Sequence, residues 1–219
     1  MFFSTVYTLL KKDLQIEMRA QQNLYGILVY AISTIFILYL TAGQPDAVQW
    51  NALFWITQLF IVVNAVVKSF VGEPSGRFIY YNSMVNPNAY LLSKMILNAI
   101  YMVILSTVSM LLFRFFLGDP VLNAVTFWGI SLLGGLGLSL VFTMLSAIAS
   151  KARQQASLIA ILGFPVIIPQ IILLTRASKA GFGEIFREGV FMNLILLLIA
   201  LDFLVVIMAS VLFPYIWKD

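Results

Sequence analysis

Long apolar stretches alternate with short polar connections along the chain, and the first of them shows the scale. No Asp, Glu, Lys or Arg occurs between residues 20 and 44, and five further stretches of similar character follow. At about 1.5 Å rise per residue, each can cross the roughly 30 Å hydrocarbon core of a bilayer as a helix. The pattern predicts an all-α, polytopic membrane protein with six transmembrane helices, at residues 23–40, 48–67, 95–113, 121–150, 156–175 and 190–217.

Composition strengthens this prediction and limits the domain organisation. Apolar residues make up 62% of the chain, charged residues 10%, and the mean hydropathy is +1.00, which is outside the range of soluble domains. The longest segment outside the spans, residues 68–94, is too short to bury a core of its own. We therefore expect one transmembrane domain over residues 1–219, and any nucleotide-binding domain on another chain.

The distribution of basic residues predicts the orientation. Six spans place both termini on one side, and the Lys and Arg residues divide nine to four in favour of that side. The nine are Lys11, Lys12, Arg19, Lys68, Arg77, Lys94, Lys151, Arg153 and Lys218, against Arg114, Arg176, Lys179 and Arg187. By the positive-inside rule both termini are cytoplasmic, as is the loop at 68–94, while residues 176–189 are periplasmic.

The first twenty residues carry an amphipathic pattern. Phe3, Tyr7, Leu10, Leu14 and Met18 share one helical face, opposite Thr8, Lys12, Gln15 and Arg19. This predicts an interfacial helix over residues 1–20, with its basic side toward lipid head groups or a partner. Its apolar run precedes the lysines and no small-residue cleavage site follows, so we expect this segment to be retained rather than removed as a signal peptide.

The loop at residues 68–94 combines turn residues with aromatic ones. Gly72, Pro74 and Gly76 precede an apolar and aromatic run, and Asn86 and Pro87 then predict a turn before the next helix. A short helix with exposed aromatic residues is one interpretation, and it would suit docking of a soluble partner. The other is a connecting loop on the bilayer surface, with Tyr80 and Tyr81 in the interfacial belt.

Three spans contain unusual residues. In the fourth, Gly134, Gly135 and Gly137 favour close approach of a neighbouring helix, although glycine is common in membrane helices generally. In the fifth, Pro165 and Pro169 predict a hinge or a re-entrant element, with a packing kink as the alternative. The periplasmic segment at 176–189 is expected to be either a short amphipathic helix or a solvated loop.

Asp202 is the only ionisable residue well inside a predicted span. It is a candidate proton carrier or polar contact, because intramembrane charges are rare. The alternative is a protonated or hydrogen-bonded side chain paired with an amide such as Asn64 or Asn98. No second intramembrane acid or base completes a proton relay.

Catalytic and metal-binding patterns do not occur in the sequence. It contains neither GxxxxGK[ST], GxSxG nor HExxH, and with no His and no Cys it lacks the usual zinc and axial haem ligands. We therefore predict no catalytic residue and no metal site. The net charge of +4 follows the topology, so nucleic-acid binding is not indicated.

Three segments together resemble the CcmB family, ABC-2-type permease subunits of cytochrome c maturation. They are KKDLQIEMR at 11–19, the loop pattern from Ser69 through Gly76 and Arg77 to LLSKMILN at 91–98, and above all GLGLSLVFTMLSAIASKARQQASLIAILGFPVIIPQIIL at 135–173. Length and six-span layout agree. The resemblance covers nearly the whole chain, and its last segment is the most specific.

The resemblance implies a bacterial inner-membrane permease that couples ATP hydrolysis by a separate ATPase, CcmA, to movement in the membrane. CcmC, CcmD and the haem chaperone CcmE are the implied further partners. Haem is the cargo, ATP and Mg belong to the ATPase, and this chain itself binds no cofactor. By analogy the loop is the coupling element, and the residues expected to contact the ATPase are Glu73, Gly76, Arg77, Tyr80, Tyr81, Asn86 and Pro87.

Two other functional classes remain open at this stage. One is an ABC-2-type permease that exports a lipid, drug or glycan along the second, fifth and sixth spans. The other is a proton-coupled carrier that uses Asp202.

Overall fold

A computed structural model of the protein describes residues 2–19, 21–67, 70, 85–150 and 155–218. These residues form six long apolar helices and one surface helix. The helices are α1 (Phe2–Arg19), α2 (Gln21–Ala42), α3 (Ala47–Val66), α6 (Pro87–Leu117), α7 (Ala124–Ala149), α8 (Gln155–Ala177) and α9 (Val190–Lys218), with a 3₁₀ turn, η1 (Ser178–Phe182). All but α1 and η1 are long and apolar enough to span a membrane. Within these residues there is no strand, so the predicted all-α class and the six spans are confirmed.

Side-chain caps and glycines set the ends of the helices. Asp46 accepts a hydrogen bond from the Gln49 backbone N–H at 2.7 Å at the start of α3, and Asn123 accepts one from the Thr126 N–H at 3.1 Å at the start of α7. Gly118 follows α6 with a φ of 82°, which is a conformation that favours glycine. Five predicted spans agree with the observed helices to within about three residues.

The third span is the exception, because α6 begins eight residues earlier than predicted and ends four residues later. Asn86 caps it and Pro87 occupies its first turn, where proline is well tolerated. With 31 residues, α6 is about 46 Å long and therefore exceeds the hydrocarbon thickness. Residues 87–94, predicted as part of the loop, are therefore the first turns of this helix.

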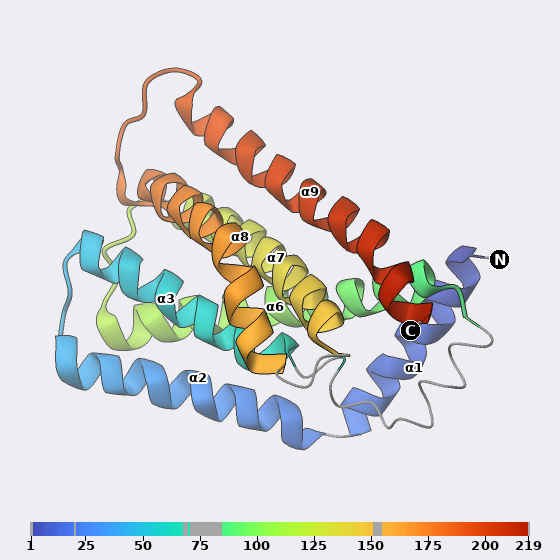
Figure 1. The fold of residues 1–219 in the computed structure, drawn as a ribbon. Helices are drawn as coiled ribbons and strands as arrows, with labels where there is room; N and C mark the ends of the chain where they lie inside the picture. Colours follow the sequence, from blue (N-terminus) through green and yellow to red (C-terminus); the bar gives the residue numbers. More distant parts are fainter. Residues whose placement is uncertain (1, 20, 68–69, 71–84, 151–154, 219) are drawn as a thin grey trace.

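The helices form a layered bundle around α7. In α7, 72% of the span is buried, compared with 11% in α2 and 17% in α9. Figure 1 shows α2 and α9 at opposite edges of the bundle with α7 between them, and both chain termini at the same end. We call this end the terminal end; the opposite, distal end carries the connections at 43–46, 118–123 and 183–189.

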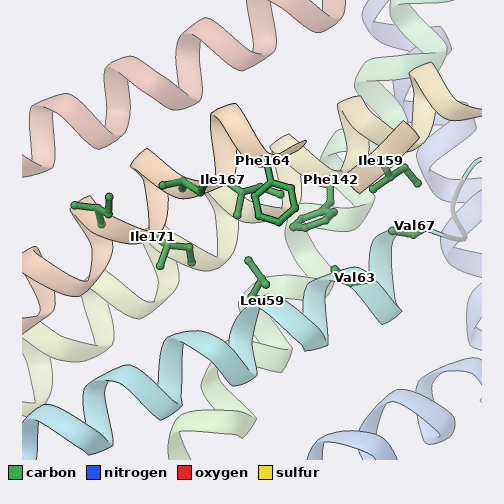
Figure 2. Close-up of a pocket in the computed structure, with 10 residues that line it drawn as sticks. Leu59, Val63, Val67, Phe142, Ile159, Phe164, Ile167 and Ile171 are labelled. Carbon is green, nitrogen blue, oxygen red and sulfur yellow. The ribbon is translucent and has the colours of Figure 1, made fainter. Parts of the chain in front are cut away.

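An apolar groove of about 530 Å³ lies between α3 and α8, with α7 beneath it (Figure 2). Leu59 and Val63 line it from α3, Phe142 from α7, and Phe164 and Ile167 from α8. The full set of lining residues is Leu59, Val63, Val67, Phe142, Ile159, Phe164, Ile167, Ile168, Ile171 and Ile172. These side chains carry no nitrogen, oxygen or sulfur, so the groove offers dispersion contacts only.

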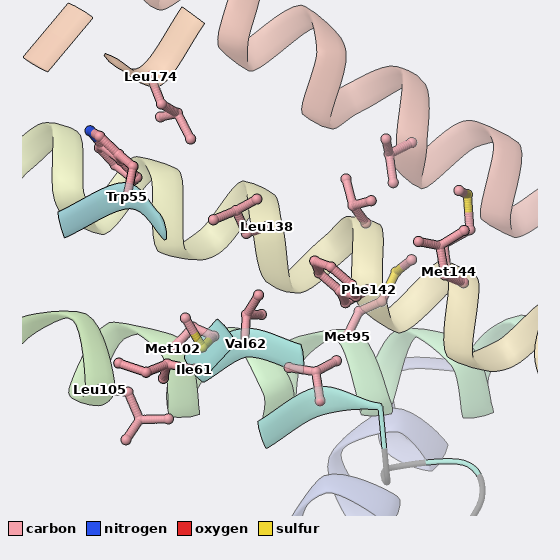
Figure 3. Packing of buried hydrophobic residues seen from close by; sticks show 14 of the residues in the cluster. Trp55, Ile61, Val62, Met95, Met102, Leu105, Leu138, Phe142, Met144 and Leu174 are labelled. Atoms are coloured by element: carbon pink, nitrogen blue, oxygen red, sulfur yellow. The ribbon is translucent and has the colours of Figure 1, made fainter. Parts of the chain in front are cut away.

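Close packing in the core depends on the glycines of α7. Figure 3 shows Leu138 and Phe142 of α7 among side chains from α3, α6 and α8. At Gly134 the Trp55 ring and Leu174 lie so close that a Cβ would be 2.5 and 2.8 Å from them, and Ser106 packs on Gly135 in the same way. The expectation that these glycines form helix contacts is confirmed, and α7 is a continuous helix.

Rings and hydrogen bonds fasten the distal end. Trp50 stacks on Phe54 at a centroid distance of 5.5 Å and contacts the rings of Phe113, Phe127 and Phe182 edge-on at 5.2 to 5.8 Å. Its indole N–H donates to the Gly118 carbonyl at 3.1 Å. These contacts join α3, α6, α7 and η1.

The segment at 176–189 is not the expected amphipathic helix, and only residues 183–189 form the exposed loop that was the alternative. α8 continues to Ala177, and η1 follows as a single 3₁₀ turn instead of an amphipathic helix. Ser178 is buried: its hydroxyl accepts from the Trp55 indole at 3.0 Å and donates to Asn51 Oδ1 at 2.8 Å. The first part of the segment is therefore packed into the bundle, whereas Ile185 is 95% exposed.

Two glycine substitutions in α7 test this packing. We expect Gly134→Ala to lower the free energy of unfolding by about 1–3 kcal/mol, because the added methyl overlaps Trp55. Gly129 has no neighbouring atom within 4 Å, so Gly129→Ala is the matched control and should be neutral or stabilising by up to about 1 kcal/mol. Thermal unfolding of the detergent-solubilised protein measures both, and equal stabilities would contradict the packing argument.

Candidate functional site

The candidate coupling site begins where the loop enters α6. The Asn86 side chain accepts a hydrogen bond from the Asn88 backbone N–H at 3.0 Å, and Pro87 starts the helix, which confirms the predicted turn. The other expected contact residues, Glu73, Gly76, Arg77, Tyr80 and Tyr81, lie outside the described residues. Their assignment as ATPase contacts stays a prediction.

A buried ion pair joins α1 to α6 two turns after this cap. Lys94 Nζ lies 3.1 Å from Asp13 Oδ2, and both side chains are 6% exposed. Lys12 Nζ lies 2.8 Å from the other carboxylate oxygen of Asp13. A buried pair of this kind holds its two helices in one register, because separating them would move the Lys94 ammonium away from the Asp13 carboxylate. Sequence reasoning missed this contact: it placed Lys94 in the loop and did not assign Asp13.

The faces of α1 are arranged differently from the simple two-sided prediction. Phe3, Tyr7 and Met18 of the predicted apolar face are 80, 65 and 65% exposed, as suits a face in contact with lipid. Val6 and Leu9 are buried on the side of Asp13. α1 therefore has a third face, directed at the protein, which the amphipathic pattern did not reveal.

Aromatic side chains secure the same region to the end of α9. Phe70, Tyr90, Phe213 and Trp217 form a connected cluster: the ring centroids of Tyr90 and Trp217 are 5.0 Å apart, and those of Phe70 and Tyr90 are 5.9 Å apart. Lys94 Nζ lies 5.5 Å from the centre of the Tyr90 ring, within the range of a cation–π contact. The first turns of α6 are thus held by α1 through charge and by α9 through aromatic packing.

Asp202 contacts an amide, but the expected partner was wrong. Gln170 Nε2 of α8 donates to Asp202 Oδ1 of α9 at 3.1 Å, opposite Gly137 of α7. Asn98 instead donates to Thr143 Oγ1 at 2.9 Å, and Asn64 donates to the Phe60 carbonyl at 2.9 Å. Gln170 was not singled out because one glutamine in an apolar span does not specify which helix it faces.

The prolines of α8 do not interrupt it. Pro165 and Pro169 lie inside one continuous helix, so the re-entrant interpretation is wrong for this span, whereas the hinge stays a prediction. Each proline removes one backbone hydrogen bond to the carbonyl four residues earlier, which weakens the helix locally. Figure 1 shows α8 bending along its length.

Comparison with known proteins gives one clear result. The model of the CcmB protein family matches residues 4–215, which is nearly the whole chain. No curated protein matches the sequence.

Breaking the α1–α6 ion pair tests the terminal-end joint. Asp13→Ala removes the carboxylate that lies 3.1 Å from the buried Lys94 ammonium, so we expect a loss of about 3–5 kcal/mol in unfolding free energy. The double variant Asp13→Ala/Lys94→Met should recover much of that loss. Lys11→Ala, at an exposed basic position on the same helix, is the control and should change stability by less than about 0.5 kcal/mol. A double variant as unstable as Asp13→Ala alone would refute the pairing argument.

Proposed function

Because the chain belongs to the CcmB protein family, it is the permease subunit of the haem-export ABC transporter of cytochrome c maturation, and we propose that it works as a mechanical relay. It is a multi-pass protein of the inner membrane without an evident catalytic domain. In this proposal a separate CcmA-like ATPase binds ATP and Mg and supplies the motion. The permease carries that motion across the bilayer.

We propose that both termini face the cytoplasm. The even number of spans and the nine-to-four division of Lys and Arg support this orientation. It makes the terminal end cytoplasmic, together with residues 68–94, and makes the distal segment at 176–189 periplasmic. The single permease domain proposed over residues 1–219 then presents to the ATPase the connection between α3 and α6, and residues 87–94 of the predicted loop form the first turns of α6.

The coupling loop is proposed to receive the ATPase through Glu73, Gly76, Arg77, Tyr80, Tyr81, Asn86 and Pro87. The observation that carries this proposal is the buried Asp13–Lys94 ion pair just beyond the loop. A push on the loop reaches the start of α6, and the ion pair and the Tyr90–Trp217 contact oblige α1 and α9 to follow. If the start of α6 lacked these contacts, a push on the loop would move the loop without moving α1 and α9.

α6 and α7 run from the terminal end to the distal end, where Phe113 of α6 and Phe127 of α7 contact the Trp50 ring. We propose that α8 accommodates the movement by bending at Pro165 and Pro169, because its freed carbonyls make it more compliant there than the neighbouring helices. The periplasmic consequence is movement of η1 and the segment that follows it.

The proposed partners are the CcmA-like ATPase, CcmC-like and CcmD-like membrane proteins, and a CcmE-like haem chaperone. Haem is the proposed cargo of the complex. The chain contains no His and no Cys, so we propose that iron is ligated by another subunit and that this chain binds no cofactor itself.

The apolar groove between α3 and α8 favours a second candidate function, export of a lipid. Its lining suits an acyl chain, whereas it offers no partner for the propionates of haem. ATP-dependent lipid movement in reconstituted vesicles, together with normal cytochrome c in a deletion strain, would select this alternative. Loss of haem-stained c-type cytochromes in that strain would select the relay.

Substitution in the loop tests coupling. We expect Glu73→Ala/Arg77→Ala to lower ATP turnover by the co-purified ATPase several-fold, with the permease still present in the membrane at the normal level. Arg187→Ala/Glu188→Ala is the matched control, because it removes one basic and one acidic residue from the exposed distal segment. Normal turnover in the loop variant would count against the loop assignment.

Chemical labelling tests the orientation. Single cysteines placed at Ser4 and Ile185 of this cysteine-free chain should differ in their reaction with a membrane-impermeant thiol reagent added to intact cells. We expect labelling at position 185 only. Labelling at position 4 from the outside would reverse the topology.

A further inference from the structure

The contact between Gln170 and Asp202 leaves one buried polar atom unexplained. Gln170 is 1% exposed, and its Nε2 donates to Asp202 Oδ1 at 3.1 Å. Its other amide atom, Oε1, is buried and has no hydrogen-bond partner among the described residues. A buried amide oxygen rarely stays without a donor, because it has lost its hydrogen bonds to water.

We propose that Asp202 is an intramembrane proton site: it is held as a neutral carboxylic acid that pairs with Gln170 through two hydrogen bonds. The amide N–H donates to Oδ1, and the acid O–H on Oδ2 donates to Gln170 Oε1. A carboxylic acid and a primary amide are complementary in this way, since each has one donor and one acceptor side by side. The added proton supplies the donor that Gln170 Oε1 lacks.

The charges around the pair favour the neutral form. α7 has no ionisable side chain along its whole length, and on α8 only Arg176 is charged, six residues beyond Gln170. On α6, which also packs against α9, Lys94 is paired with Asp13 and Arg114 with Asp119, near the two ends of that helix. In the part of the chain that the structure describes, no cation pairs with Asp202. A carboxylate at this depth would face the low-dielectric interior with one amide donor.

Gly137 brings the pair against the backbone of α7. A Cβ at this position would overlap both Gln170 Nε2 and the Asp202 carboxyl group. Any other residue at position 137 would therefore displace the Gln170 amide or the Asp202 carboxyl group from its present position. The acid–amide pair lies at the junction of three helices, one residue after Pro169, and it fastens the distal half of α8 to α9.

Infrared spectroscopy of the reconstituted protein tests the protonation state directly. With carboxyl-¹³C aspartate, we expect a carbonyl-stretch band of a protonated carboxylic acid at neutral pH, which disappears in Asp202→Asn. In Gln170→Leu the band should shift to higher frequency, because the acid loses its acceptor. Only carboxylate bands in the wild-type protein would overturn the proposal, and this readout depends on neither the ATPase nor cytochrome c assembly.

A thermal-unfolding cycle tests the pairing. Asp202→Asn keeps a neutral group that can pair with an amide, so its unfolding temperature should stay near that of the wild type. Asp202→Leu and Gln170→Leu should each lower it by several degrees, and the double variant should be hardly less stable than either single one. Additive losses would show that the two side chains do not act as a pair. A large rise in unfolding temperature for Asp202→Asn would show that the native carboxyl is charged.

Discussion

Side chains from three directions reach the backbone of α7, and the rest of the bundle depends on this close approach. Lipid tails are as apolar as leucine, so helices in a bilayer associate through packing and polar contacts rather than through exclusion of water. Gly134, Gly135 and Gly137 make room for both kinds of contact, packing and polar. The first admits Trp55, whose indole reaches Ser178; the second admits Ser106 of α6; the third admits Gln170 and Asp202. These three positions let side chains of α3, α6, α8 and α9 lie against the α7 backbone.

The two ends of the bundle are fastened by different chemistry, which suits a part that receives motion at one end. At the distal end the rings around Trp50 and the hydrogen bonds of Ser178 lie within the bundle and connect several helices. At the terminal end the contacts are an ion pair and an aromatic cluster in the first turns of α6, next to the proposed coupling loop. Ion pairs keep their partner while the surrounding side chains rearrange, since electrostatic attraction falls off more gradually with distance than packing does.

Hydropathy alone predicted the spans, because only helices can satisfy their backbone in lipid, and the glycines of α7 also indicated where helices meet. Partners across the bundle could not be predicted. Lys94 was predicted to lie in the loop, yet it is buried in α6 beside Asp13 of another helix. For Asp202 the sequence suggested an amide partner such as Asn64 or Asn98, and only the tertiary arrangement identified Gln170. The protein-facing side of α1 was missed for the same reason: a helix that touches both lipid and protein has two apolar sides, which a single stripe does not describe.

The length of α6 has a mechanical consequence. A helix that is longer than the hydrocarbon layer, as α6 is with 31 residues, either tilts or protrudes from it. Where such a helix protrudes, it can pivot about the part that the bilayer and the neighbouring helices hold. A sideways force on its outer arm tilts the whole rod, so the far arm swings in the opposite sense without any change in its internal hydrogen bonds.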